Sequence, residues 1–382
     1  MHRVKYFALL IFAVAGIYLA LPMMQAGDQQ AASAITHSDS PFIISPLATG
    51  LRHPWGMDQL PTGEYLITER GGRLWLFNPQ TGNKTQINGL PSIAAQGQGG
   101  LLDVLIHPDY ANNGWIYLSL AAGDDFGIGT EVMRARLKDN ALVNTEKIFE
   151  LKPKTDSGYH FGSRLAFDDN GYLFISLGDR GDREEAQNLN NHMGTLIRLH
   201  DDGRIPTDNP FVGNKNAQPE IYSYGHRNIQ GMTFDTKSKR LWTHEHGPQG
   251  GDELNLPQMG KNYGWPTITY GVNYVVGTQI GEGTHKEGME QPVHYWVPSI
   301  APSGMAVYSG NEFKEWNGDL LVGSLKFQLL ARLKMNGEKV VSEHRYLKEE
   351  LGRIRDIHID SEGYILLLTD AAKGGLYKLS RR

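Results

Sequence analysis

A sixfold internal repeat is the feature that most constrains the fold of this chain. Each unit passes from a turn into an apolar stretch, through a second turn and into a second apolar stretch. The units open at Trp55-Gly56-Met57, Gln98-Gly99-Gly100-Leu101, His160-Phe161-Gly162-Ser163, Gln230-Gly231-Met232, Ser303-Gly304-Met305 and Arg353-Ile354-Arg355. A repeated pair of short strands is typical of a propeller blade. We therefore predict an all-β fold, a six-bladed β-propeller.

The second apolar stretch of each unit has the alternation and the β-branched and aromatic residues of a strand. These stretches are 64–67, 115–118, 172–175, 240–243, 319–322 and 364–367. Since the last unit ends almost at the C-terminus, ring closure needs an N-terminal strand, which we predict between Phe42 and Leu47. An unclosed ring would leave an aggregation-prone edge. We expect long loops, which are usually functional, at 121–130, 181–192, 204–219 and 268–300.

Composition restricts the class of protein. With 382 residues, 40% of them hydrophobic, the chain can bury a large core. No linker interrupts the repeats, so we expect one propeller domain over residues 45–382. The net charge of −5 argues against nucleic acid or an anionic membrane surface as a partner. The absence of cysteine excludes disulfides, thiolate metal sites and a catalytic thiol.

The N-terminus has the pattern of an export signal. A basic start at residues 2–5 precedes an apolar run over residues 6–24, so residues 1–26 predict a signal peptide. The run is also near the lower length limit for spanning a bilayer, which leaves an uncleaved membrane anchor open. Residues 27–44 are rich in Gln, Ala and Ser and predict a flexible lead-in. We expect a periplasmic, exported protein whose only membrane tether would be this segment.

Polar residues recur at one point of the repeat, where a propeller would bring them together around its central channel. They are Gln98, His160, Arg227, Asn228, Arg353 and Arg355, with Lys326 after the second strand of the fifth unit. Arg353 and Arg355 are two apart and point to one side of a strand. An isolated Arg-x-Arg is more often a solvated strand. At converging positions, however, clustered cations predict a pocket for a ligand with several carboxylates.

His160 is the only histidine that opens a repeat. A lone histidine is more often structural, but at the mouth of the ring an imidazole is placed to take a proton from a substrate hydroxyl. Arg164, four residues on, braces the loop or serves the site, and the sequence leaves both open.

The segment from Trp242 to Glu253 contains candidate metal ligands. His244 and His246 share a strand face, as transition-metal ligands do, whereas Asp252, Glu253 and the carbonyls of a Gly/Pro-rich turn favour calcium. An ordinary turn without a metal ion is the remaining alternative for this segment. The chain has no Gly-x-Gly-x-x-Gly opening a helix, P-loop lysine or Gly-x-Ser-x-Gly elbow, which argues against nucleotide cofactors and a hydrolase triad.

Motifs from every unit, in order, carry a resemblance to a known family. They are His53-Pro54-Trp55, Gly97-Gln98-Gly99-Gly100-Leu101-Leu102-Asp103, His160-Phe161-Gly162, Tyr224-Gly225-His226-Arg227-Asn228, Glu245-His246-Gly247-Pro248, Gly251-Asp252-Glu253-Leu254-Asn255, Asn262-Tyr263-Gly264-Trp265-Pro266 and Arg353-Ile354-Arg355-Asp356. Over residues 45–380, roughly, the chain resembles the soluble pyrroloquinoline-quinone-dependent aldose sugar dehydrogenases, which are six-bladed propellers.

The resemblance implies a function and a set of site residues. An aldose is oxidised at its anomeric carbon to a lactone, and electrons pass to an acceptor that the sequence does not identify. His160 is implied as the general base, and Arg227 as the group that stabilises developing charge. The implied contacts of pyrroloquinoline quinone (PQQ), a tricarboxylate, are Gln98, Arg227, Asn228, Lys326, Arg353 and Arg355. The carbonyls of Gly247 and Pro248 are implied to hold a calcium ion at the cofactor, and Glu253 and Tyr263 a structural calcium.

Two departures and two alternatives qualify this interpretation. Ile229 stands where the family has proline after Arg-Asn, which affects the stiffness of that turn but not its side chains. Tyr159 stands where the family has a small polar or acidic residue before the base, so we expect different sugar contacts there. A calcium-dependent lactonase on a similar propeller needs converging carboxylates rather than cations. A non-catalytic binding propeller gives no reason for His160, Arg227 and the Arg353/Arg355 pair to coincide by repeat position.

Overall fold

The structure is a computed structural model that describes residues 35–37 and 40–382. The expected signal peptide or anchor at 1–26 therefore lies outside the described residues, as does most of the lead-in at 27–44. Within the described ranges, no helix has both the length and the apolar character needed to cross a membrane. The propeller forms the compact unit Ala34–Arg382.

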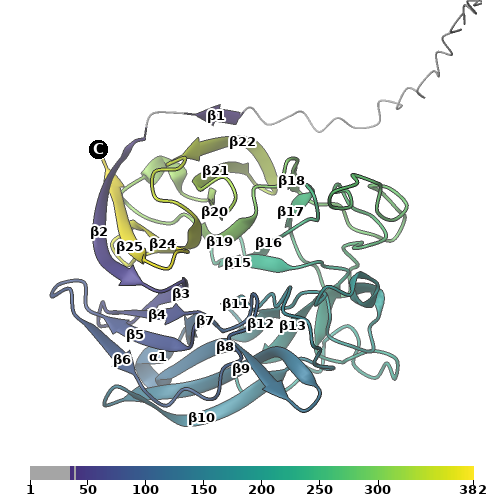
Figure 1. Cartoon of the computed structure of the whole chain (residues 1–382), viewed down its shortest axis with the longest axis horizontal. Coiled ribbons are helices and arrows are strands. Elements are labelled where there is room, and N and C mark those ends of the chain that lie inside the picture. The colour runs from purple at the N-terminus through teal and green to yellow at the C-terminus, as the bar shows by residue number, and fades with distance from the viewer. Residues whose placement is uncertain (1–34, 38–39) are drawn as a thin grey trace, which may run out of the picture. The chain divides into compact units, whose positions relative to one another are not determined.

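Six antiparallel sheets make up this unit, one for each predicted repeat (Figure 1). The first three are β3(Pro54–Gln59)-β4(Tyr65–Glu69)-β5(Arg73–Phe77)-β6(Lys84–Ile87), β7(Leu101–Ile106)-β8(Trp115–Asp124)-β9(Gly127–Lys138)-β10(Ala141–Glu150) and β11(Leu165–Phe167)-β12(Tyr172–Ser176)-β13(Thr195–His200)-β14(Ile221–Tyr224). The fourth and fifth are β15(Ile229–Asp235)-β16(Arg240–Glu245)-β17(Asp252–Asn255)-β18(His294–Trp296) and β19(Pro302–Val307)-β20(Leu320–Ser324)-β21(Leu329–Asn336)-β22(Lys339–Tyr346). The sixth contains β23(Ile354–Ile359)-β24(Ile365–Thr369)-β25(Gly374–Arg381). The all-β prediction is thereby confirmed.

The sixth sheet is completed from the other end of the chain. Strand β2 (Phe42–Leu51) pairs antiparallel with β25, with Phe42 opposite Arg381 and Leu51 opposite Gly374. This confirms the predicted closing strand and extends it beyond Leu47. The propeller thus begins just before the expected boundary at residue 45. A further short strand, β1 (Ile35–His37), pairs parallel with β22.

The ring closes because each innermost strand contacts the next. β3, β7, β11, β15, β19 and β23 touch in that order, and β23 contacts β3. Sheets pack face to face, so a middle strand such as β24 is buried on both sides. Its Leu366 and Leu368 pack with the first sheet, whereas Ile365 and Leu367 pack with the fifth. Each such side chain contributes about 1.5–3 kcal/mol of burial.

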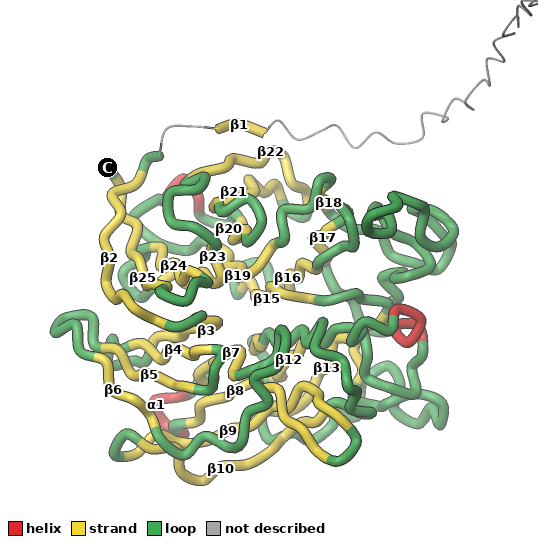
Figure 2. The backbone as a smooth tube through the Cα atoms, in the orientation of Figure 1, coloured by secondary structure: helices red, strands yellow, loops and turns green. Residues whose placement is uncertain are grey.

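In the part of the chain that the structure describes, helices are confined to short segments between strands (Figure 2). They are α1 (Tyr110–Asn113) and the 3-10 turns η1 (Arg183–Gln187) and η2 (Lys314–Trp316). The prediction of a loop at 121–130 is wrong. β8 and β9 run through this stretch as a hairpin, and Asp124 pairs with Gly127 at its turn. The glycines and alanines of that stretch hid the strands, because they lack the β-branched enrichment on which the prediction relied.

Arg164 lies at the centre of the ring, which settles its role. Its Nη1 is 3.2 Å from Asp103 Oδ1 and 2.8 Å from Asp356 Oδ1, and its Nε donates to Gln230 O at 2.9 Å. These partners belong to β7, β23 and β15, so one buried guanidinium braces inner strands from across the ring.

The inner strands enclose carboxylates at the end of the channel beyond Arg164. Burial raises the pKa of Asp58 to about 7 and that of Asp356 to about 6. Each carboxylate accepts a backbone N–H from a neighbouring sheet: Asp58 from Ile106 at 2.7 Å, and Asp356 from Met57 at 3.0 Å. This far end of the channel is therefore an acidic belt that joins sheets.

Candidate functional site

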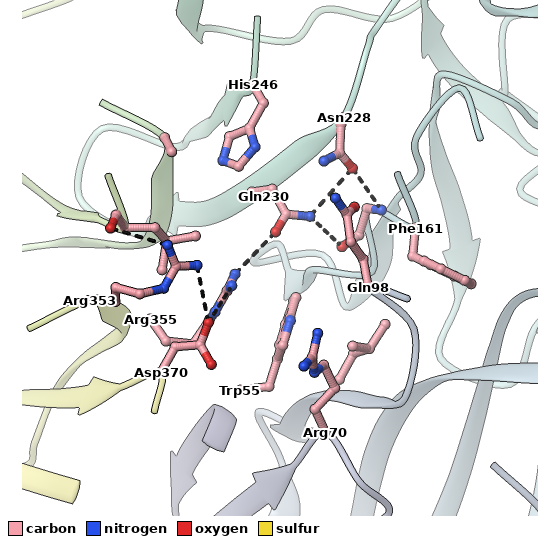
Figure 3. Close-up of a pocket in the computed structure, with 14 residues that line it drawn as sticks. Trp55, Arg70, Gln98, Phe161, Asn228, Gln230, His246, Arg353, Arg355 and Asp370 are labelled. Carbon is pink, nitrogen blue, oxygen red and sulfur yellow. Dashed lines mark hydrogen bonds and ion pairs between the residues drawn. The ribbon is translucent and has the colours of Figure 1, made fainter. Parts of the chain in front are cut away.

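A cavity of about 720 Å³ opens where the inner strands begin (Figure 3). Residues at the start of all six units line it: Trp55, Gln98, Gly162, Asn228, Ala301 and Arg353. Arg70, Leu102, Phe161, Gln230, His246, Leu325, Arg355 and Asp370 complete the lining. The repeat positions thus converge in space, and we call this space the mouth cavity.

Arg353 and Arg355 face one carboxylate inside the mouth cavity. Their Nη2 atoms lie 3.3 and 3.4 Å from Asp370 Oδ2, so both guanidiniums are on the same side, as predicted. Burial raises the pKa of Asp370, but the charge of Arg355 and the hydrogen bonds from His53 and Arg353 bring it down to about 2. Burial lowers the pKa of Arg355 to about 10. At neutral pH the two cations therefore share a single anion and leave a net positive charge.

Arg70, Trp55 and His246 also line the mouth cavity, a position that the sequence did not predict for them. Arg70 adds a cation, whose Nη1 donates to Gly97 O at 3.0 Å. Trp55 stacks under Arg164, with 4.2 Å from the guanidinium carbon to the ring centroid. His246 donates from Nε2 to Pro302 O at 2.6 Å, and burial lowers its pKa to about 3. The place of Trp55 in the lining could have been predicted from the sequence, because Trp55 opens the first repeat.

A smaller cavity of about 310 Å³ adjoins the mouth and contains His160, Arg227, Pro248 and Trp265. His160 Nδ1 lies 2.5 Å from Asp179 Oδ1, and Asp179 Oδ2 accepts the Trp265 indole N–H at 2.8 Å. Because the carboxylate accepts the Nδ1 proton, the neutral imidazole has an unprotonated Nε2, as a general base requires.

Asp179 is the most important residue that sequence reasoning missed. Burial raises its pKa, but the hydrogen bond and charge of His160, together with Arg227, lower it below the usual value. The carboxylate is therefore ionised at neutral pH and stabilises an imidazolium. Its sequence signal was its place shortly after the second strand of the third unit, as Asp370 follows the second strand of the sixth.

Gln98 connects His160 to the mouth cavity. His160 has a left-handed backbone (φ 52°), and its N–H donates to Gln98 Oε1 at 2.9 Å. Opposite, Gly178 has no room for a side chain, since a Cβ there would lie 2.2 Å from His160 O. The contacts on both sides fix the loop that carries His160.

The buried Arg180 also holds the loop that contains His160. Its guanidinium donates to the carbonyls of Ser157 and Tyr159 and lies 3.6 Å from the Phe161 ring centroid. Burial lowers its pKa to about 10. The Tyr159 ring, 61% exposed, lies beside the His160 ring at 6.5 Å between centroids.

Arg227 and Asn228 serve different cavities. Arg227 lies beside His160, with its Nη1 3.1 Å from His246 O. Asn228 lines the mouth, and its Oδ1 accepts Gly162 N–H at 3.1 Å. Lys326 lines neither cavity. Its ammonium lies 5.4 Å from the Phe327 ring, while its neighbour Leu325 reaches the mouth.

The residues implied for calcium fall in two places. Pro248 lines the His160 cavity, and Gly247 N–H donates to Asp252 Oδ1 at 2.9 Å, which orders the turn. Glu253 faces Glu245 across β16 and β17. Burial and the charge of Glu245 raise the pKa of Glu253 well above its usual value.

The second place has donors that suit calcium. Asn255 Oδ1 is buried there without a hydrogen-bond partner, while its amide donates to Glu245 at 3.0 Å. Two facing carboxylates and a free amide oxygen are hard donors. The Tyr263 hydroxyl donates to Leu256 O at 2.7 Å and accepts Gln258 N–H at 3.0 Å, which leaves the backbone carbonyl of Tyr263 as the atom that could join the set. Within residues 35–37 and 40–382, no three His, Cys, Asp or Glu side chains are gathered for a metal.

The lactonase alternative loses its geometric basis. It requires carboxylates free at the mouth, whereas Asp370 and Asp179, which line the two cavities, are paired with arginine and histidine. The His244/His246 metal alternative also weakens, since His246 Nε2 is occupied by Pro302 O.

Comparison with known proteins places this chain in a family. Residues 51–378 match the sequence model of the Glucose / Sorbosone dehydrogenase family. The chain is 44% identical over 356 residues to the aldose sugar dehydrogenase YliI of Escherichia coli K12, which covers 92% of this chain and 96% of that protein. The chain therefore belongs to the Glucose / Sorbosone dehydrogenase family.

Solved structures support the same assignment. The soluble aldose sugar dehydrogenase of Escherichia coli in its apo form superposes with a TM-score of 0.87 at 44% identity, over 89% of this chain and all of that one. The PQQ-bound aldose sugar dehydrogenase of Streptomyces coelicolor superposes with a TM-score of 0.73 at 26% identity, over 90% and 99% of the two chains.

Proposed function

We propose that this protein is a PQQ-dependent aldose sugar dehydrogenase that oxidises the anomeric carbon of an aldose to a lactone. The observation that carries the proposal is the His160–Asp179 pair, 2.5 Å apart, beside a cavity whose charge is net positive. The family match and the relatives named as aldose sugar dehydrogenases, one of them PQQ-bound, support it.

The mouth cavity fits a polycarboxylate cofactor. Arg355 is buried with long contacts to Asp370 and Gln230 (3.4 and 3.3 Å), so its charge is incompletely compensated. Arg353, Gln98 and Asn228 add donors around the same space. Planar guanidiniums suit carboxylates. When bound, the quinone supplies a two-electron acceptor for the hydride that leaves C1 of the sugar.

His160 then takes the proton of the anomeric hydroxyl on Nε2. The proton loss leaves electron density that forms the carbonyl bond of the lactone, and the C1 hydride departs with its electron pair. Asp179 stabilises the imidazolium and holds its orientation. Arg227, in the same cavity, offers a positive charge to developing negative charge. Two electrons afterwards leave to an acceptor outside the protein.

Calcium and location complete the proposal. The carbonyls of Gly247 and Pro248 would hold one ion beside His160, and Glu253 and Tyr263, with Glu245 and Asn255, a second. Lys326 would contact the cofactor only if its side chain turned from Phe327 toward the mouth. Residues 1–26 would export the protein to the periplasm, either cleaved or retained as an anchor.

Reconstitution tests the function. Purified apo-protein is mixed with PQQ and Ca²⁺, and dye reduction by glucose is followed together with the absorbance of the bound quinone. We expect activity only with both additions, and its loss in chelator. His160→Gln serves as the control that binds the cofactor without turnover. Undiminished aldose oxidation in chelator without quinone would falsify the cofactor assignment.

A further inference from the structure

His246 presents the mouth cavity with a hydrogen-bond acceptor. Its Nε2 is 2.6 Å from Pro302 O, and a carbonyl oxygen can only accept, so the proton is on Nε2. The other ring nitrogen, Nδ1, is then an acceptor. It makes no hydrogen bond to any described residue, and the ring lines the cavity (Figure 3).

Side-chain oxygens that line the cavity are already engaged by protein donors. Asp370 Oδ1 accepts a hydrogen bond from His53, and Asp370 Oδ2 accepts hydrogen bonds from Arg353 and Arg355. Gln98 Oε1 accepts His160 N–H, and Asn228 Oδ1 accepts Gly162 N–H. Gln230 Oε1 accepts from Arg355.

Two backbone carbonyls of lining residues are engaged as well. Ala301 O accepts Leu325 N–H at 3.0 Å, and Leu325 O accepts Arg353 Nη1 at 3.3 Å. His246 Nδ1 is thus the exception among these acceptors.

The remaining polar groups of the lining are donors. Arg70, Arg353 and Arg355 carry guanidiniums, and Figure 3 shows the amides of Gln98 and Asn228 beside the same space. A ligand made only of acceptors would satisfy these donors and leave His246 Nδ1 without a partner. A buried acceptor left unpaired is costly.

We propose that His246 is a cofactor-recognition residue that accepts a hydrogen bond from the ligand's own N–H, which for PQQ is the pyrrole N–H. The three carboxylates of the ligand match the donors, and its pyrrole N–H matches the acceptor. His246 therefore distinguishes this quinone from polycarboxylates that lack a donor. The inference rests on the proposed function, because the ligand is the one proposed there.

A thermodynamic cycle tests the contact without turnover. PQQ and its 1-methyl derivative, which lacks the pyrrole N–H, are titrated into Ca²⁺-containing wild-type protein and His246→Leu, with tryptophan fluorescence as the readout. The cycle isolates the contact because steric effects of the methyl group and the lost Pro302 bond appear in both arms. We expect His246→Leu to lower PQQ affinity roughly tenfold but to change 1-methyl-PQQ affinity little.

A matched variant and a folding control complete the design. His246→Gln retains a donor and an acceptor and should recover part of the PQQ affinity. Thermal melts of each apo-protein establish that the variants are folded. Equal losses of affinity for both quinones on His246→Leu would overturn the inference while leaving the proposed function intact. Absence of PQQ binding to the wild type would overturn both.

Discussion

The two ends of the central channel use charge in opposite ways. At the mouth, Arg353 and Arg355 share one carboxylate and face open space. At the far end, the buried carboxylates of Asp103 and Asp356 are held by Arg164 and by backbone N–H groups of neighbouring sheets. Asp103, for example, accepts Leu165 N–H at 2.9 Å.

The difference shows how one repeat serves two purposes. Polar groups that are satisfied inside the ring join its sheets, whereas polar groups left with free capacity are available to a ligand. We therefore expect substitutions at the mouth to change binding or rate, and substitutions at the far end to change stability.

The largest effect should come from His160→Gln, which keeps polarity and approximate size but removes the proposed general base. Turnover should fall by about 10²–10⁴, the usual contribution of a positioned general base. Single-turnover reduction of bound quinone by an aldose measures this without dependence on the dye. Near-normal reduction would exclude His160 as the base and leave the mouth without an assigned reaction.

Arg164→Met tests the far end. Removing this guanidinium leaves Asp103 and Asp356 buried without their cation, which should cost about 3–5 kcal/mol of unfolding free energy. Urea denaturation of the apo-protein gives the value, and PQQ titration of the folded variant gives its affinity. Lost quinone affinity with unchanged stability would contradict the division between the two ends.

Arg353→Ala and Arg355→Ala should lower the affinity for PQQ rather than the stability of the protein. Each removes a charge-assisted contact of about 1.5–3 kcal/mol, which is roughly a tenfold to hundredfold loss of PQQ affinity. Apo-protein melting should change little. Lys326→Ala is the comparison variant: because Lys326 lines neither cavity, we expect it to lower PQQ affinity less than either arginine substitution. A loss as large as that of the arginines would show that its ammonium reaches the ligand.

The effect expected at Asp58 is a dependence of stability on pH rather than a loss at one pH. Its pKa is raised by burial from 3.8 to about 7, so between those values the unfolded state has lost a proton that the folded state retains. Stability should therefore fall as pH rises from about 4 to 7, by at most about 1.4 kcal/mol per unit for this group. Asp58→Asn should flatten that slope in apo-protein melts, whereas a slope equal to that of the wild type would remove Asp58 as its source.

The sequence predicted the fold and the polar site residues that open the repeats. His160 and the arginine pair stood at positions defined by periodicity, so their convergence followed from the ring. Asp179 and Asp370 escaped it because each lies after the second strand of its unit, where an aspartate is also an ordinary turn residue. The β8–β9 hairpin escaped it because glycine and alanine carry little strand signal.

The sequence by itself determined the sixfold ring, its closure by the N-terminal strand and the cationic character of the mouth, because periodicity and charge are local properties of the chain. Only the tertiary structure decided which charges remain free. Asp370 neutralises part of the Arg353/Arg355 pair, Asp179 orients His160, and Pro302 O fixes the His246 proton, each from a distant segment. Ionisation and tautomer depend on the groups within hydrogen-bonding distance, and distances between remote segments exist only after folding.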